Sequence, residues 1–461
     1  MAFSAKFEFV SEFKNLNISK STIQSLSKLG YTKLTSIQKV SIPPSLMGFD
    51  VLGSAKTGSG KTLCFVIPVI EVSLIQNYIQ NDILDNLVKS CILFPTRELG
   101  VQIFDFIRNI ERKIKIKICL GGFVEKKKEK CSVLLSTPGS LFNHLSDKIL
   151  NLNQLKILAM DEADEILNTN FIKITDLLMF ILPKKRQVLF FSATLNSKLK
   201  NITRINLKNP IFCSLNVKKM YFSKQKKYNY IQETHNIKQF AVISHNYKKN
   251  AHLLSFLSSH KTQKIIIFVS TKKQIKYLYN ITKLIFPEIE TTLIYGSMNQ
   301  TKRIRNFLKF STNERRGVLF STDLTSRGLD FRSVEWIIQL DCPKNIQSYF
   351  HRIGRTGRFL ETGKTILFLN YQEIKFINTL GKNFVKIHII NVHKKQIEIT
   401  QKKIEVLLKK NKDYKKIALD AFLSYAKFIY FQKNKNCFEF KNFNWKKIAQ
   451  NFGLNPISCD L

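Results

Sequence analysis

The segment Ala55–Thr62, which reads AKTGSGKT, carries residues that could hold a phosphate group. It follows the strand-like sequence DVLG and precedes a long apolar run. Its glycines let backbone amides turn toward phosphate oxygens, and a helix that begins after the loop adds partial positive charge. We expect Lys61 to reach the β- and γ-phosphates of a nucleotide and Thr62 to hold magnesium. The strict motif has glycine where this chain has Ala55, and a chance Gly-Lys-Thr turn is the alternative.

An acidic sequence, Asp161-Glu162-Ala163-Asp164, follows the apolar run LKILAM. The carboxyl end of a buried strand is where an α/β sheet presents its chemistry. We expect Asp161 to coordinate magnesium, directly or through water, and Glu162 to orient and deprotonate the water that attacks the γ-phosphate. The alternative is a solvated helix start, since acidic residues favour that position.

The composition is that of a globular protein with an unusual charge. The 461 residues include 74 Lys plus Arg against 33 Asp plus Glu, a net charge of +41. A basic excess of this size favours a polyanionic partner such as nucleic acid. The alternative explanation is a codon or proteome bias toward Lys, Asn, Ile and Phe, so charge alone does not decide the function.

Cysteine spacing and hydropathy indicate the compartment. The eight cysteines are scattered and form no Cys-x-x-Cys pair, which argues against a disulfide framework or a zinc site. The N-terminus has no apolar segment of signal-peptide length, and no run reaches the ~18 apolar residues of a membrane span. We therefore expect a soluble intracellular protein.

Short apolar runs alternate with helix-sized segments, which predicts βαβ units and parallel sheets twice over. The expected strands are 51–53, 91–94, 133–135, 157–160 and 188–191, then 265–269, 292–295, 318–320, 336–340 and 366–369. A basic stretch without clear periodicity separates the two series. Beyond about residue 385, segments 397–410 and 414–430 have the spacing of amphipathic helices. The predicted fold is α/β, with domains at 1–215 and 229–385, a linker at 216–228 and a helical C-terminal extension at 386–461.

With both motifs in place, the chain resembles the DEAD-box RNA helicases over nearly all of residues 13–385. The resemblance implies two tandem RecA-like domains, ATP and Mg²⁺ as cofactors, and RNA bound without sequence preference. Gln38 would hydrogen-bond to the adenine edge and Tyr31 would pack on its face, although Leu34 stands where the family has Pro. The implied ATP contacts are Phe13, Tyr31, Gln38, Ala55, Thr57, Gly58, Ser59, Gly60, Lys61, Thr62, Asp330 and Phe359.

Other motifs resemble the RNA-contacting and coupling elements of this family. Hydroxyls, backbone amides and an Arg at strand ends suit contacts to phosphates and 2′-hydroxyls. Position 140 is Ser, where the family has Arg after Thr-Pro-Gly. The implied RNA contacts are Thr96, Arg97, Gly122, Thr137, Ser270, Thr271, Gly296, Arg303 and Thr322. The implied coupling residues are Ser192, Thr194 and His351.

Arg355 and Arg358, in HRIGRTGR, resemble arginine fingers that neutralise charge on the transferring phosphoryl group. With Lys61 and Glu162 they complete the implied catalytic set. Because the phosphate loop and these arginines lie in different domains, the resemblance implies that hydrolysis needs domain closure, which RNA spanning both domains would favour. It also implies local, weakly processive strand separation. The alternative is an ATP-gated RNA clamp or chaperone with little unwinding.

The segment 386–461 resembles the C-terminal extension of ribosome-assembly DEAD-box helicases. The run Asp50–Gly58 also resembles the member of that group linked to small-subunit rRNA processing and release of a small nucleolar RNA. This resemblance implies pre-rRNA or a small nucleolar RNA as target, pre-ribosomal proteins as partners, a nucleolar location in the nucleus and a monomeric state. A simple packing helix is the alternative for this segment. A DNA helicase and a translation-initiation helicase are rival readings; the RNA-type loops count against the first and the C-terminal tail against the second.

Overall fold

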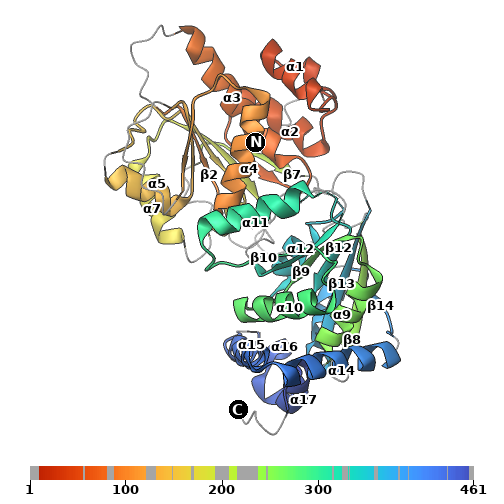
Figure 1. Cartoon of the computed structure of the whole chain (residues 1–461). Coiled ribbons are helices and arrows are strands. Elements are labelled where there is room, and N and C mark those ends of the chain that lie inside the picture. The colour runs from red at the N-terminus through yellow and green to blue at the C-terminus, as the bar shows by residue number, and fades with distance from the viewer. Residues whose placement is uncertain are drawn as a thin grey trace. The chain divides into compact units, whose positions relative to one another are not determined.

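The computed structural model describes residues 10–55, 58–79, 88–120, 131–147, 149–167, 171–192, 207–214, 237–244, 248–313, 316–323, 331, 333–357, 362–382, 385–392, 394–432 and 434–455. The chain divides into two compact units, Met1–Tyr228 and Asn229–Leu461 (Figure 1).

The first unit is built on a parallel seven-stranded sheet with the order β3-β4-β2-β5-β6-β1-β7. Its central strands are short, apolar and buried, as expected of a sheet covered by helices. The strands are β1 Val51–Ser54, β2 Ser90–Leu93, β3 Ile116–Cys119, β4 Val133–Ser136, β5 Ile157–Met160, β6 Gln187–Ser192 and β7 Ile211–Ser214. The helical elements are η1 Phe13–Asn15, α1 Lys20–Lys28, α2 Ser36–Leu46, α3 Lys61–Ile79, α4 Arg97–Ile110, α5 Pro138–Ser146, α6 Ala163–Ile166 and α7 Ile172–Ile181.

The second unit holds a parallel sheet with the order β10-β11-β9-β12-β13-β8-β14. Counted from the first strand of each unit, both sheets have the same order. The strands are β8 Ile237–Ser244, β9 Lys264–Phe268, β10 Thr291–Ile294, β11 Gly317–Ser321, β12 Trp336–Gln339, β13 Gly363–Asn370 and β14 His388–Ile389. The helical elements are α9 Lys249–Ser259, α10 Lys272–Ile285, α11 Gln300–Thr312, α12 Ile346–Ile353, η4 Tyr371–Ile374, α13 Lys375–Lys382, α14 Lys394–Lys410, α15 Lys412–Tyr430, α16 Lys435–Phe438, η5 Phe440–Asn442 and α17 Trp445–Asn451.

The predicted fold class is confirmed, and every strand expected from the sequence is present. The ends of these strands differ from the expected ones by at most three residues. The sequence analysis missed β3, β7, β8 and β14. Three of these are edge strands, where one side lacks a neighbour and the apolar pattern is weak. The strand β14 also shows that the chain still adds to the sheet after residue 385. The domain boundaries and the linker at 216–228 stay predictions, because residues 215–236 lie outside the described part.

The C-terminal segment packs on the second sheet's helices rather than standing apart. Helix α15 lies along α10 and α14 lies along α9. The backbone N–H of Asn250 donates to Asn451 Oδ1 at 2.8 Å, and Asn250 Nδ2 donates to the Asn451 carbonyl at 3.1 Å. The Tyr277 hydroxyl donates to the Phe452 carbonyl at 3.0 Å. These bonds make the segment part of the second unit's fold.

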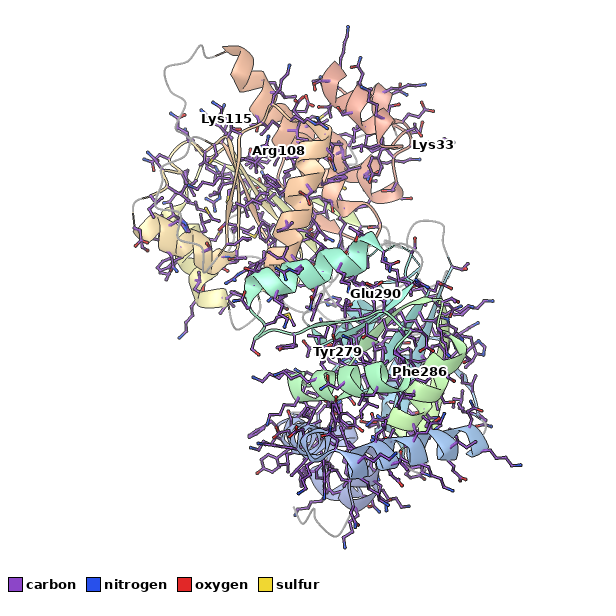
Figure 2. The ribbon with its side chains drawn as sticks, in the orientation of Figure 1. Lys33, Arg108, Lys115, Tyr279, Phe286 and Glu290 are labelled. Carbon is purple, nitrogen blue, oxygen red and sulfur yellow. The ribbon has the colours of Figure 1, made fainter. Side chains whose placement is uncertain are left out.

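On another part of this unit, Glu290, labelled in Figure 2, holds the C-terminal end of α11 beside the start of β10. Its carboxylate accepts a hydrogen bond from Asn313 Nδ2 at 2.6 Å and pairs with Lys309 Nζ at 3.2 Å. The ion pair is exposed, so it orients the end of α11 more than it adds to stability.

A buried ion pair joins α9 to η4 and faces α15. Lys249 Nζ donates to Glu373 Oε2 at 2.6 Å, and the two side chains are 4% and 0% exposed. The backbone N–H of Asn370 donates to the same oxygen at 2.7 Å, and the Tyr425 hydroxyl lies 3.5 Å from Oε1. Burial raises the pKa of Glu373, and the Lys249 charge opposes that rise.

Replacing Lys249 with Met leaves Glu373 buried without its cation and raises the pKa of Glu373 further. In the folded variant Glu373 stays protonated above pH 4.5, the ordinary pKa at which it loses its proton in the unfolded chain. The free energy of unfolding therefore falls as pH rises from 4.5 toward the raised pKa of the folded state. We expect a loss of about 3–5 kcal/mol at about pH 8 and a smaller loss at about pH 5.

Urea unfolding followed by tryptophan fluorescence measures this, because both tryptophans, Trp336 and Trp445, lie in the second unit. Lys261→Met is the matched control, since Lys261 forms an exposed pair with Glu288 and its loss should leave the transition unchanged. Equal losses at the two pH values would contradict the expectation.

Candidate active site

The phosphate loop begins at the end of β1 and runs into α3. Gly58 and Gly60 have φ values of 76° and 87°, a left-handed conformation that favours glycine. A Cβ at Gly60 would lie 2.5 Å from Gln38 Nε2, so this position also needs glycine for space. The loop is tied to the sheet where the Ala55 N–H donates to the Ser192 carbonyl at 3.2 Å.

Lys61 starts α3 with its side chain buried at 6% exposure. Its Nζ has no hydrogen-bond partner among the described residues. A buried ammonium without a partner is costly, and an anionic ligand at the helix start would satisfy it. Thr62 follows on the first turn of the same helix. The geometry therefore fits a phosphate group.

The predicted adenine element is hydrogen-bonded directly to this loop. Thr35 Oγ1 donates to the Ser59 carbonyl at 2.8 Å, and Gln38 Nε2 donates to the Gly60 carbonyl at 3.0 Å. The Thr35 N–H donates to Gln38 Oε1 at 2.8 Å, which completes a capping box at the start of α2. The start of α2 and the phosphate loop are thus held as one structure.

The two predicted aromatic contacts take different positions. The Tyr31 ring is partly exposed and meets Phe106 edge-on, with centroids 6.0 Å apart. Phe13 is buried, and its N–H donates to the Thr32 carbonyl at 3.1 Å. The structure therefore buries Phe13 and bonds its backbone to the residue that follows Tyr31.

Helix α1 is anchored through a buried carboxylate on α3. Glu71 accepts hydrogen bonds from the Ser19 N–H at 2.9 Å and the Thr22 hydroxyl at 2.7 Å. The sequence analysis did not identify Glu71, because a lone acidic residue in an apolar helix carries no motif.

The acidic pair stands at the end of β5. The Asp161 N–H donates to the Leu93 carbonyl at 3.0 Å, and Asp161 Oδ1 accepts the Glu162 N–H at 2.8 Å. Glu162 has φ 48°, a left-handed conformation that is uncommon for non-glycine residues and that clusters at functional sites. Burial raises the pKa of Asp161 to about 7; the Glu162 charge adds to this and the Lys61 charge opposes it. Because the Lys61 charge acts on the Asp161 carboxyl, the two side chains lie near one another.

A magnesium ion fits this site only together with a ligand. Among the described residues, no group of three or more His, Cys, Asp or Glu gathers to hold a metal. Thr62 and Asp161 supply few oxygens, and Mg²⁺ commonly binds through one or two carboxylates plus substrate phosphates. The donor set therefore suits a metal–nucleotide complex rather than a free ion.

In the first unit, the predicted RNA contacts lie where strands end and helices begin. Thr96 precedes α4, Arg97 is its first residue, and Thr137 precedes α5. The Thr96 Oγ1 is buried and has no hydrogen-bond partner in the described part of the chain. Ser140 is buried on α5, and its carbonyl lies 2.8 Å from His144 Nδ1. Position 140, where the family has Arg, is thus buried against α5 itself.

In the second unit, Ser270 and Thr271 lie between β9 and α10. Thr271 caps α10 by accepting the Gln274 N–H at 3.2 Å. Asp341 Oδ2 accepts both the Ser270 N–H at 2.7 Å and Gln274 Nε2 at 3.1 Å. Asp341 was missed by the sequence analysis, although it follows the apolar strand β12 just as Asp161 follows β5.

Of the remaining predicted RNA contacts, Gly296 and Thr322 stand at the same edge of this sheet. Gly296 comes after β10 and Thr322 comes directly after β11, while Arg303 is buried on α11. Ser321 Oγ donates to the Ile294 carbonyl at 3.2 Å and links the two strand ends. Because parallel strands share their carboxyl edge, Gly296 and Thr322 lie at the same edge of the sheet as Ser270 and Thr271.

The segment that contains His351 and Arg355 is packed inside the second unit. His351 and Arg355 are both buried, and Arg355 Nε donates to the His351 carbonyl at 3.2 Å. Between them, Arg352 pairs with Asp323 Oδ1 at 2.6 Å and donates to the Asp341 carbonyl at 2.8 Å. Arg352 and Asp323 therefore bind the helix α12 to the ends of β11 and β12. Neither residue was assigned this function from the sequence.

Several predicted site residues lie outside the described part of the chain: Thr57, Gly122, Thr194, Asp330, Arg358 and Phe359. Within the described part, no helix is both long and apolar enough to cross a membrane.

Three family models match consecutive parts of the chain. The DEAD/DEAH box helicase model matches residues 35–202, and the helicase conserved C-terminal domain model matches 248–360. The model described as "ATP-dependent rRNA helicase SPB4-like, C-terminal extension" matches residues 411–456. The first two matches contain the phosphate loop, the acidic pair and the HRIGRTGR segment.

Curated relatives extend the match over almost the whole chain. ATP-dependent RNA helicase DBP4 of Debaryomyces hansenii is 35% identical over 453 residues, which are 96% of this chain and 57% of that protein. Probable ATP-dependent RNA helicase DDX10 of Homo sapiens is 33% identical over 452 residues, which are 96% of this chain and 50% of that protein. The chain thus spans little more than half the length of these relatives.

Among solved structures, the DEAD-box helicase Mss116 bound to ssRNA and UDP-BeF matches with a TM-score of 0.83 at 24% identity. That match covers 96% of this chain and 91% of the Mss116 chain, and it shows the shared fold. With its Asp-Glu-Ala-Asp sequence at the end of β5 and both helicase models matched, the chain belongs to the DEAD-box helicase family.

Proposed function

We propose that this protein is an ATP-dependent RNA helicase that locally unwinds or remodels RNA. The observation that carries the proposal is the buried Lys61 ammonium, which has no hydrogen-bond partner among the described residues and shares a site with the Asp161–Glu162 pair. The family membership supports the same activity, although the chain spans only part of the length of its relatives.

The first unit's residues bind ATP and prepare the water for attack. Lys61 and the loop amides hold the phosphates, while the Gln38 amide, which is fixed against the loop, contacts the adenine edge of the nucleotide. Glu162 orients the attacking water and takes its proton. Thr62 and Asp161 would hold Mg²⁺, which when bound neutralises charge on the β- and γ-phosphates.

The residues at the carboxyl ends of the strands grip RNA without reading its sequence. In the first unit these are Thr96, Arg97, Gly122 and Thr137, and in the second Ser270, Thr271, Gly296, Arg303 and Thr322. Hydroxyls and backbone amides there suit phosphate and 2′-hydroxyl oxygens, which are the same for every base. RNA bound in this way supports unwinding at many different sequences.

ATP and RNA act together by favouring closure of the two domains. Arg355 and Arg358 supply positive charge to the transferring phosphoryl group, and Phe359 and Asp330 add nucleotide contacts from the second domain. Ser192, Thr194 and His351 couple the ATP site to the bound RNA. Hydrolysis then reopens the clamp and releases the strand.

The biological task that we propose is rRNA processing during ribosome assembly, with pre-rRNA or a small nucleolar RNA as target. The SPB4-like extension model at 411–456 and the DBP4 and DDX10 relatives support this proposal. It implies a monomeric protein that acts with pre-ribosomal proteins in the nucleolus of the nucleus. The net charge of +41 is consistent with a polyanionic partner.

Glu162→Gln removes the base that activates water but keeps the shape of the site. We expect RNA-stimulated ATP hydrolysis to fall by about 100-fold or more, with ATP affinity unchanged. A steady-state assay with and without single-stranded RNA measures this. Glu398→Gln, an exposed change on α14, is the control. Retained hydrolysis in Glu162→Gln would contradict the assignment, and absence of hydrolysis in the unaltered protein would favour an ATP-gated clamp.

Gly60→Ala places a Cβ 2.5 Å from Gln38 Nε2 at a backbone φ of +87°. The loop must then shift away from α2, so we expect ATP affinity to fall by about tenfold or more. Titration with a fluorescent ATP analogue measures the change. Gly381→Ala is the matched control, because its Cβ would meet no atom within 4 Å. Equal ATP affinity in the two variants would show that the loop tolerates the side chain.

Asp341→Ala removes the acceptor for the Ser270 N–H and Gln274 Nε2. A buried donor without a partner costs about 1–3 kcal/mol, so the Ser270 loop should loosen. We expect the RNA concentration for half-maximal ATP hydrolysis to rise about tenfold, while the rate at saturating RNA is retained. A change in that rate alone, without a change in RNA dependence, would argue against the positioning of this loop by Asp341.

A further inference from the structure

A row of aromatic rings lies at the C-terminal end of α15 and continues into η5 and α17. We call Tyr430, Phe431, Phe440 and Trp445 the aromatic row. The Phe431 and Tyr430 centroids are 5.2 Å apart, Tyr430 and Phe440 are 5.6 Å apart, and Phe440 and Trp445 are 4.5 Å apart. Each ring therefore touches the next along the surface of the second unit.

The first two rings of the row, Phe431 and Tyr430, are exposed although they are large and mainly apolar. Phe431 is 75% exposed and Tyr430 is 58% exposed, while Phe440 and Trp445 are half-buried. Other aromatics of the same segment build its core: Phe422, Phe438, Phe443 and Phe452 are all buried. The packing of α15 thus does not use the exposed rings, and an exposed aromatic patch of this kind marks an interaction site.

Lysines flank the row in the sequence. Between residues 427 and 447 the sequence has six lysines and one acidic residue, Glu439. The lysines that the structure describes are all exposed: Lys427, Lys435, Lys441, Lys446 and Lys447. Lys435 Nζ lies 5.8 Å from the centre of the Tyr430 ring and donates to the Tyr430 carbonyl at 3.0 Å. The surface therefore offers flat apolar rings within a positive field.

The half-buried rings are held in fixed positions. Trp445 Nε1 donates to the Phe440 carbonyl at 3.1 Å, and the Trp445 ring also packs against the buried Phe443 at 5.6 Å. Helix α15 itself is packed along α10. A rigid aromatic surface loses little conformational freedom when a ligand binds to it.

We propose that the aromatic row is a stacking surface for single-stranded RNA. Bases stack on exposed aromatic rings whatever their identity, while neighbouring lysines contact the phosphates. The positive charge favours an RNA strand over an apolar protein segment as the occupant. The row is separate in sequence from the RNA residues at the ends of β9, β10 and β11. The proposal deepens the proposed function, because it assigns to the C-terminal segment a hold on RNA that needs no ATP.

The test measures RNA binding without nucleotide, using the full chain and a uridine RNA of about 12 nucleotides, which is within the size of single-strand sites. Tyr430→Ala/Phe431→Ala should weaken binding by about tenfold or more, because each stacked base contributes strongly. Both side chains are exposed, so the fold should be retained. Phe180→Ala is the matched control, since Phe180 on α7 is 88% exposed and lies in the first unit.

A second readout uses Trp445 itself. In Trp336→Phe, Trp445 is the only tryptophan, and RNA stacked on the row should quench its emission. The proposal is supported if Tyr430→Ala/Phe431→Ala loses affinity for the RNA and, in the Trp336→Phe background, loses the quenching of Trp445. Phe180→Ala should keep both the affinity and the quenching. It is overturned if the double variant binds RNA as tightly as the unaltered chain, or if saturating RNA leaves the emission unchanged; an apolar protein partner is then the better occupant.

These measurements are independent of hydrolysis. Failure of the stacking surface leaves the effect of Glu162→Gln untouched, and failure of hydrolysis leaves RNA binding without nucleotide untouched. The two conclusions can therefore fail separately.

Discussion

Parallel pairing of the strands decides where this chain can place its chemistry. The register pairs Ser54 with Ser192 and Leu93 with Met160, so β1, β2, β5 and β6 end at the same edge of the first sheet. The phosphate loop, Thr96 and Asp161 all start from that edge. The second sheet repeats the arrangement, with Ser270, Gly296, Thr322 and Asp341 each following a strand. Functional side chains far apart in sequence are neighbours because of backbone pairing alone.

Two buried charged groups show how the fold treats charge differently in a site and in a core. Lys249 and Glu373 are paired at 2.6 Å, and the backbone of Asn370 adds a further hydrogen bond. Lys61 has no such partner among the described residues, and burial raises the pKa of its neighbour Asp161 to about 7. The first cluster is complete without a ligand. The second holds electrostatic strain that an anionic ligand with a metal would relieve.

Sequence patterns predicted the parts of this protein that are both buried and periodic. Apolar runs located every inner strand except β8, and the glycine and lysine spacing located the phosphate loop. Edge strands such as β3 and β7 were missed because half-exposed strands lack an apolar run. The positions of individual side chains could not be predicted from the sequence either: Phe13 is buried, and Ser140 packs against His144. Asp341 and Arg352 act through contacts with residues distant in sequence, which a motif does not display.

The shared strand order has a consequence for how the protein is made. In each unit the first strand pairs with two strands that come last in sequence, so β8 pairs with β13 and β14. The helix that follows β8 is also bound through Asn250 to Asn451, 201 residues later. A ribosome releases the chain from its N-terminus onward, so β8 emerges long before any of these partners exist. The apolar strand β8 therefore stays unpaired until nearly all of the second unit has been translated. A chaperone that shields β8 would act in that interval.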